Sequence, residues 1–117
     1  MLRGIRGAIT VERNRKADII AAASQLLSEM ARQNKVRMVE VASIIFSATP
    51  DLNAEFPAKA VKELGWNSVP RLCAQEINVP EGLKKCIRIL MHANTRKHQK
   101  QIKHVYLKGA GKLRMEG

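Results

Sequence analysis

Aromatic side chains are scarce in this sequence: one Trp, one Tyr and two Phe make up 3% of its 117 residues. So few rings cannot build a stacking platform for single-stranded nucleic acid, and they leave the core to aliphatic side chains. Long apolar runs are missing as well, since none approaches the roughly 20 residues that cross a membrane. The first seven residues are too interrupted to form a signal peptide. We therefore expect one cytoplasmic domain over residues 1–117, with a short tail from about 109 to 117.

Cysteine is also rare, and the chain offers few metal ligands. Cys73 and Cys86 lie in apolar, strand-like segments, which favours reduced thiols over a disulfide. Together with His92, His98 and His104 they match no zinc finger, ribbon or helical ligand pair. No phosphate-binding loop or dinucleotide fingerprint occurs. We predict no metal site and no cofactor.

Acidic residues are outnumbered by basic ones, with 10 Asp and Glu against 21 Lys and Arg and a net charge of +11. Such an excess indicates an anionic partner, for which nucleic acid is the usual first candidate. The basic residues are scattered through the whole chain, however, and no helix-turn-helix spacing is visible. Nucleic acid therefore remains an alternative to a small polyanion.

Hydrophobic periodicity predicts the order strand, helix, strand, helix, strand, strand, strand. A helical period runs over residues 14–33, where Asn14 is the expected N-cap, and a second helix has Pro57 in its first turn and Gly65 just past its end. This order predicts an α+β fold, with a mixed five-stranded sheet packed on two helices. Part of one sheet face would be poorly covered in a monomer, which favours an oligomer. The predicted strands are residues 2–11, 41–48 within the segment 36–48, 68–79, 86–91 and about 103–108.

An arginine interrupts the apolar run of residues 86–91. Arg88 cannot shed its charge, so a carboxylate of the protein or an anionic ligand must face it. Glu76, in the preceding strand-like segment, is the natural counterpart for a structural ion pair. Arg6 lies on the strand face opposite Ile5 and Ile9, and a solvated edge arginine is its simplest interpretation.

Further cations share a helix face, and no nucleophile accompanies them. Lys59 and Lys62 are three residues apart, which also fits a solvated helix face. The set of arginines, lysines, one glutamate and one tyrosine suits a small polyanion held by positioned donors. A reaction at such a site would need only electrostatics and orientation.

Eight short stretches carry a family resemblance across nearly the whole chain. In their order and spacing they resemble the AroH-type chorismate mutases, which are monofunctional enzymes. The stretches are RGIRGA (residues 3–8), SATPDL (47–52), FPAKA (56–60), LGW (64–66), VP (69–70), CAQE (73–76), CIR (86–88) and HVYL (104–107).

The resemblance implies a homotrimer whose sheets assemble into a pseudo-α/β-barrel, with active sites at the subunit interfaces. It also implies a cofactor-free Claisen rearrangement of chorismate to prephenate, in the biosynthesis of phenylalanine and tyrosine. An inactive trimer of the same fold that binds anions or nucleic acid is the alternative.

The resemblance also implies roles for individual residues. Arg88 would hydrogen-bond the ether oxygen of chorismate and hold a carboxylate, while Arg6, with Tyr106 beside it, would bind the side-chain carboxylate. Glu76 and the region of Cys73 would contact the ring hydroxyl and the developing positive charge. These two residues are three apart, so both can line one site only where the strand bulges or bends. Other expected substrate contacts are Phe56, Ala58, Lys59, Lys62, Leu72, Leu113 and Arg114.

One of these positions departs from the family pattern. Lys62 stands where the family usually has arginine, which keeps the charge but loses the planar fork of a guanidinium.

Overall fold

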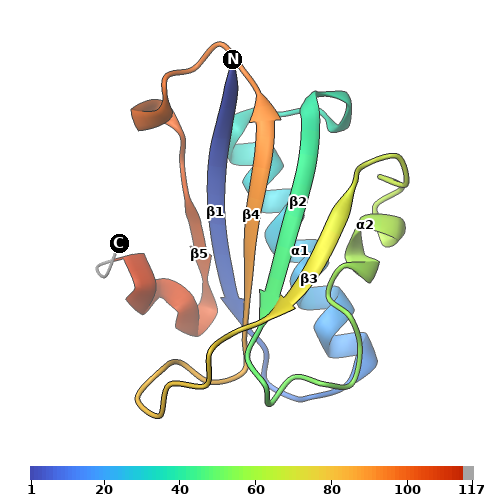
Figure 1. The fold of residues 1–117 in the computed structure, drawn as a ribbon, viewed down its shortest axis with the longest axis vertical. Helices are drawn as coiled ribbons and strands as arrows, with labels where there is room; N and C mark the ends of the chain where they lie inside the picture. The colour runs from blue at the N-terminus through green and yellow to red at the C-terminus, as the bar shows by residue number, and fades with distance from the viewer. Residues whose placement is uncertain (115–117) are drawn as a thin grey trace.

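The computed structural model describes residues 1–114, which form a five-stranded sheet (Figure 1). The central strand β4 runs antiparallel to both of its neighbours, β1 and β2. The outer strands β3 and β5 run parallel to β2 and β1 respectively. The predicted mixed five-stranded sheet is thereby confirmed. Its strands are β1 (Leu2–Thr10), β2 (Val41–Ala48), β3 (Arg71–Gln75), β4 (Cys86–Asn94) and β5 (Val105–Leu107), in the order β3-β2-β4-β1-β5.

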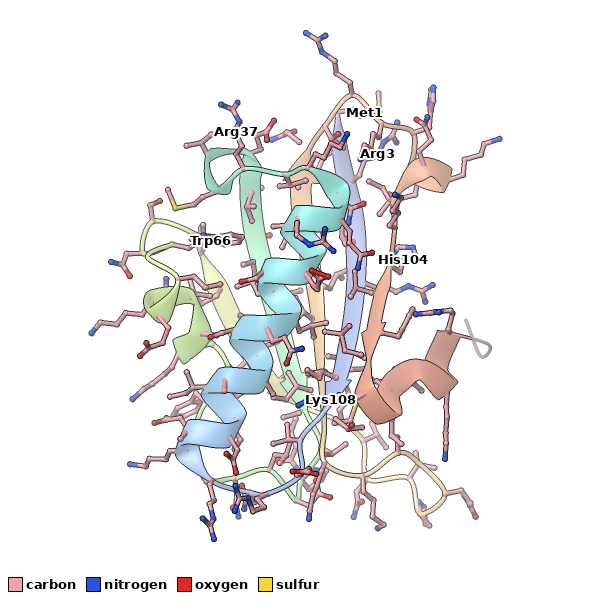
Figure 2. All side chains as sticks on the ribbon, turned by 180° about the vertical axis from the view of Figure 1, so that it is seen from behind. Met1, Arg3, Arg37, Trp66, His104 and Lys108 are labelled. Atoms are coloured by element: carbon pink, nitrogen blue, oxygen red, sulfur yellow. The ribbon has the colours of Figure 1, made fainter. Side chains whose placement is uncertain are left out.

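One long helix covers one face of this sheet. Helix α1 (Lys16–Asn34) crosses behind β1, β4 and β2 in Figure 1 and lies in front of them in Figure 2. Helix α2 (Lys59–Glu63) contacts α1 and is little more than one turn, after which Gly65 adopts a positive φ of 76°. The predicted α+β class is confirmed. Three 3-10 helices complete the fold: η1 (Met38–Glu40), η2 (Gln99–Gln101) and η3 (Lys108–Arg114).

The core lies between α1 and the sheet face that it covers. Alternation along the strands sends Ile5 and Ile9 of β1, and Ile89 and Met91 of β4, toward the helix, where each is at most 2% exposed. The helix passes so close to β1 that a Cβ added at Gly7 would lie 2.4 Å from the Met30 sulfur. The absence of a side chain at Gly7 therefore sets the spacing between β1 and α1.

The first helix begins two residues later than predicted, and Asn14 is not its N-cap. Arg15 occupies the N-cap position and makes no side-chain capping hydrogen bond. The carboxamide oxygen of Asn14 instead accepts hydrogen bonds from the backbone N–H groups of Asn53 and Ala54, each at 3.0 Å. Asn14 thus organises a loop about 40 residues away, a long-range pairing that a local capping rule does not see.

A buried asparagine joins the end of α1 to the connection between β4 and β5. Asn34 is 1% exposed, and its side-chain amide bonds the carbonyls of Met30 and Lys103 at 2.8 and 2.9 Å. Its side-chain oxygen accepts from Lys103 N–H at 2.8 Å, and its carbonyl accepts from Lys97 Nζ at 3.0 Å. Residues 97–103 are therefore tied to the helix although they contain only one turn of regular structure.

The bounds of the remaining strands differ from their sequence patterns in both directions: β3 and β5 are shorter than predicted, and β4 extends to Asn94. β2 spans Val41–Ala48, the apolar run identified in the sequence, and residues 38–40 before it form η1. β3 pairs with β2 in unbroken register from Ile44 with Arg71 to Ala48 with Gln75. The bulge or bend predicted to bring Cys73 and Glu76 together is therefore absent from the paired strand. Glu76 instead follows its end, with its N–H bonded to the carbonyl of Ala48 at 2.9 Å.

Candidate active site

The sheet face turned away from α1 carries two rows of side chains that cross the strands. One row consists of Leu72, Ile45, Leu90 and Arg6, which are cross-strand partners from β3 to β1. The next row consists of Ala74, Ser47, Arg88, Ala8 and Tyr106, from β3 to β5. We call this surface the open face.

Arg88 stands at the centre of the second row between two small side chains, Ser47 and Ala8. Its Nε lies 3.5 Å from Oε1 of Glu76, with the side chains 46% and 24% exposed. The other carboxylate oxygen of Glu76 accepts a hydrogen bond from the Ser47 hydroxyl. The predicted pairing of Arg88 with Glu76 is thus confirmed, although Glu76 lies just past its strand.

Stability alone explains little of this placement. An ion pair with a half-exposed arginine contributes only about 0–1 kcal/mol to folding. Ser47 and Ala8 line the same hollow as Arg88, so there is open space beside the guanidinium that a purely structural pair would not need. The arrangement leaves Arg88 accessible to a ligand while Glu76 and Ser47 restrict its position.

A cavity of about 360 Å³ opens on this surface and brings together several of the predicted residues. Arg6 and Arg88 supply two cations, Tyr106 supplies a phenol, and Leu113 closes one side. Arg88 also lines a second hollow, together with Glu76 and residues 77–79 and 82–84. Two guanidinium groups on one exposed surface fit a small ligand that carries more than one negative charge.

The 3-10 helix at the end of the described chain folds back onto the open face. Ala110 is fully buried against Ala8 and Cys86, with Tyr106 and Leu113 packed around them. Arg114 lies 5.9 Å from the centre of the Tyr106 ring, and its guanidinium donates to the Tyr106 carbonyl at 3.4 Å. The structure therefore places Leu113 in the cavity wall and Arg114 behind Tyr106. The predicted tail continues over residues 115–117, which lie outside the described residues.

The other predicted residues gather on a different part of the chain. Phe56, Ala58, Lys59 and Lys62 border a separate hollow around the start of α2, and Phe56 is 66% exposed. Lys59 Nζ lies 3.4 Å from Oε2 of Glu55. The backbone N–H of Phe56, and secondarily Lys59, lower the pKa of Glu55, which keeps this carboxylate charged. Within one chain, none of these residues reaches the cavity that holds Arg88.

Cys73 is likewise separated from Glu76. It points to the helix side of β3 and lines a hollow with Phe56 and Lys59, whereas Glu76 faces Arg88. Burial raises the pKa of the Cys73 thiol, only partly offset by a hydrogen bond from the N–H of Ala58. Burial likewise raises the pKa of Cys86, to about 11. Both thiols are protonated at neutral pH, which is unfavourable for nucleophilic chemistry.

Two residues at these sites, Ser47 and Arg71, were given no role by the sequence interpretation, and a third, Leu72, lies apart from the others within one chain. Ser47 was assigned no role, although its place opposite Arg88 in a neighbouring strand could have indicated one. Arg71 borders the hollow around α2, and its Nη1 donates to the carbonyls of Asn67 and Val69 at 3.2 and 3.0 Å. Leu72 lies on the open face, 63% exposed, and lines neither the cavity that holds Arg88 nor the hollow around α2.

The described residues show neither a metal site nor a membrane-spanning helix. Within residues 1–114, no three His, Cys, Asp or Glu side chains lie together in a way that could hold a metal ion. No helix in that part of the chain is long and apolar enough to cross a membrane.

Comparison with known proteins identifies the family. The family model for chorismate mutase type I matches residues 2–117. Chorismate mutase AroH of Bacillus subtilis is 50% identical over 115 residues, or 97% of this chain and 91% of that protein. Its namesake from Thermus thermophilus is 44% identical over 115 residues, with 97% and 94% covered.

A solved structure gives the same answer. Chorismate mutase from Clostridium thermocellum superposes with a TM-score of 0.91 at 50% identity, covering 92% of this chain and 96% of that one. The resemblance seen in the eight sequence stretches thus extends over the full length and the three-dimensional fold. This chain belongs to the type I chorismate mutase family.

Proposed function

We propose that this protein catalyses the rearrangement of chorismate to prephenate at the open-face cavity that holds Arg6 and Arg88. The observation that carries the proposal is the position of Arg88, half-exposed beside Glu76 and sharing a cavity with Arg6 and Tyr106. Family membership supports the same reaction.

The chemistry requires little beyond what this surface offers. Chorismate carries two carboxylates, and in the rearrangement a C–O bond breaks while a C–C bond forms within one molecule. No nucleophile, general base or cofactor takes part. Catalysis then depends on holding the reactive conformation and on stabilising the charge that develops, negative on the ether oxygen and positive on the ring fragment.

Each polar group on the open face has a place in this scheme. Arg88 donates to the ether oxygen and to one carboxylate, while Arg6 binds the other carboxylate beside Tyr106. Glu76 keeps one edge of the guanidinium occupied and faces the ring, where its negative charge favours the developing cation. Because the charges are fixed before the substrate arrives, they need not reorganise during the reaction.

The site is completed by a second copy of the chain in this proposal. The residues around α2, Lys59 among them, lie in a hollow separate from the one that holds Arg88. The open face also exposes an apolar strip of Leu72 and Ile45, 63% and 37% exposed, which association would cover. We propose a homotrimer in which the α2 hollow of one subunit, with Cys73 nearby, faces the Arg88 cavity of the next. The proposed setting is the cytoplasm, where the product supplies phenylalanine and tyrosine synthesis.

The primary test follows the ultraviolet absorbance of chorismate, which falls as the substrate is consumed. Wild-type protein should turn chorismate over, and Arg88→Ala should lose at least about 10²-fold in kcat/KM. Arg96→Ala is the matched control, because it removes an exposed arginine from the connection between β4 and β5, and it should retain activity. A folded trimer without turnover would refute the proposal and return attention to binding of anions or nucleic acid.

The shared site has its own test. Activity per chain should fall on dilution in parallel with dissociation of the trimer, followed by analytical ultracentrifugation. A fully active monomer would contradict a site completed by a neighbouring subunit.

A further inference from the structure

The strand that carries Arg6 has an unusual edge. β5 pairs with β1 only from Gly7 onward, so the first half of β1 has no strand beside it on that side. Side chains from the connection between β4 and β5 take its place. The carboxamide of Gln99 accepts from Gly4 N–H at 3.0 Å and donates to the Gly4 carbonyl at 2.6 Å, as a paired strand residue would.

His104 continues this arrangement at the next outward-facing position. The Arg6 N–H donates to Nδ1 of His104 at 2.9 Å. A hydrogen bond in this direction requires Nδ1 to be unprotonated, so the proton of the neutral ring resides on Nε2. Burial, and secondarily the charge of Arg6, lower the pKa of His104, which favours that neutral form at pH 7.

The backbone of Arg6 needs such a restraint more than most strand residues do. Gly4 and Gly7 lie close on either side of it, and glycine widens the range of backbone conformations open to a strand. On the β4 side the residue is held by its pairing with Leu90. On the β5 side, the Arg6 N–H is bonded to the imidazole of His104 rather than to a strand partner.

We propose that His104 is a positioning residue for Arg6: by accepting the Arg6 N–H it fixes the backbone from which the guanidinium reaches the substrate carboxylate. The inference rests on the proposed function for what Arg6 binds. It assigns His104 no contact with substrate and no proton transfer.

The expected kinetic signature follows from the role of Arg6. The carboxylate that Arg6 holds keeps its charge throughout the reaction, so the guanidinium binds substrate and transition state about equally, and disturbing it should raise KM more than it lowers kcat. A single hydrogen bond corresponds to roughly a 3- to 10-fold change. Removing the acceptor, as in His104→Leu, should therefore raise KM by about that factor.

Two variants separate positioning from a general weakening of the strand edge. His104→Asn places its side-chain oxygen close to where Nδ1 lies, so it should restore KM to near the wild-type value. Gln99→Leu removes two hydrogen bonds from the same strand edge, two residues from Arg6, and should lower thermal stability without raising KM. A structural role alone would make His104→Leu and Gln99→Leu alike in both readouts.

Acid should reproduce the effect of removing the acceptor. Below its pKa the ring gains a proton on Nδ1, loses the hydrogen bond and adds a positive charge near Arg6. Among the described residues, Arg6 on β1 is the charged group that acts on this ring, while Lys103 and Tyr106 lie on the same segment and Arg114 lies over the Tyr106 ring. The wild-type KM should rise toward low pH, and His104→Asn should flatten that rise.

The outcomes distinguish this inference from the function on which it rests. Wild-type turnover with an unchanged KM in His104→Leu, or a KM that Asn does not restore, would overturn the positioning role and leave the function intact. Absence of wild-type turnover would overturn the function. In that case the hydrogen bond from Arg6 N–H to His104 can still be tested by NMR, because a ring protonated on Nδ1 at neutral pH would refute it directly.

Discussion

The two faces of the sheet are built from the same strands but have different roles: one packs against α1, and the other carries the candidate site. On β4, Ile87, Ile89 and Met91 point to α1 and are almost fully buried, while Arg88 points the other way and stays half-exposed. On β1, Ile5 and Ile9 are buried beside an exposed Arg6. Neighbouring residues of one strand thus belong to the core and to the candidate site in turn.

This division implies that stability and activity can be changed almost independently. Burial of the covered face supplies most of the free energy of folding. The charges on the open face destabilise the fold little, because they are hydrated and Arg88 is paired with Glu76. Substitutions on the two faces should therefore fail in different ways.

The largest effect is expected on the covered face. Phe46 on β2 is fully buried, so Phe46→Ala should lower the free energy of unfolding by about 3–5 kcal/mol, through lost burial and the cavity left behind. Urea unfolding measures the loss, and kcat should be unchanged under conditions where the variant is still folded. A loss below about 1 kcal/mol would show that the covered face does not supply most of the stability.

The next effect concerns the open face. Arg88→Lys keeps the charge but cannot hold Glu76, the ether oxygen and a carboxylate together, so kcat/KM should fall about 10²–10³-fold. Its urea midpoint should match that of the wild type within error, since the side chain is 46% exposed. A substantially lower urea midpoint together with wild-type activity would show that Arg88 serves stability rather than catalysis.

A third change tests what covers the open face. Ile45→Glu puts a charge in the middle of the apolar row between Leu72 and Leu90. Association would bury the exposed 37% of Ile45, and burying an unpaired carboxylate there instead costs several kcal/mol, so association should weaken at least about 30-fold. Sedimentation of the variant measures this, with Val39→Glu, on η1 and 74% exposed, as the control that should associate normally. Equal association of the two variants would contradict a covered open face.

The smallest effect is a pH dependence of stability that His104 controls. Its pKa is lowered in the folded chain from an ordinary value of 6.5, so the unfolded chain takes up a proton first as the pH falls. Stability from this residue is therefore complete above pH 6.5 and is lost as the pH falls through the lower folded value. Thermal midpoints should decline over that range in the wild type and less steeply in His104→Asn. Parallel curves would exclude this contribution.

The sequence predicted most accurately what depends on near neighbours. Alternation along a strand placed Arg6 and Arg88 opposite the apolar residues, and the need to pair a buried-strand arginine identified Glu76. Both interpretations follow from the period of a strand and the permanent charge of a guanidinium.

The failures share a dependence on distant parts of the chain. Asn14 bonds a loop some 40 residues away instead of starting its own helix. The bulge or bend predicted between Cys73 and Glu76 is absent, because β3 keeps its register with β2 and the two side chains point apart within one chain. The positions of Ser47 and Arg71 depend on strand register and on a loop. No pattern within a single segment specifies either.

The separation of the two hollows on one chain has a genetic consequence in the proposed trimer. A chain lacking Arg88 retains a sound α2 hollow, and a chain lacking Lys59 retains a sound Arg88 cavity. When two such defective alleles are expressed together, each mixed trimer has one subunit interface at which an intact α2 hollow faces an intact Arg88 cavity. Heteroallelic complementation, in which two inactive copies of one gene restore growth together, is therefore built into this geometry.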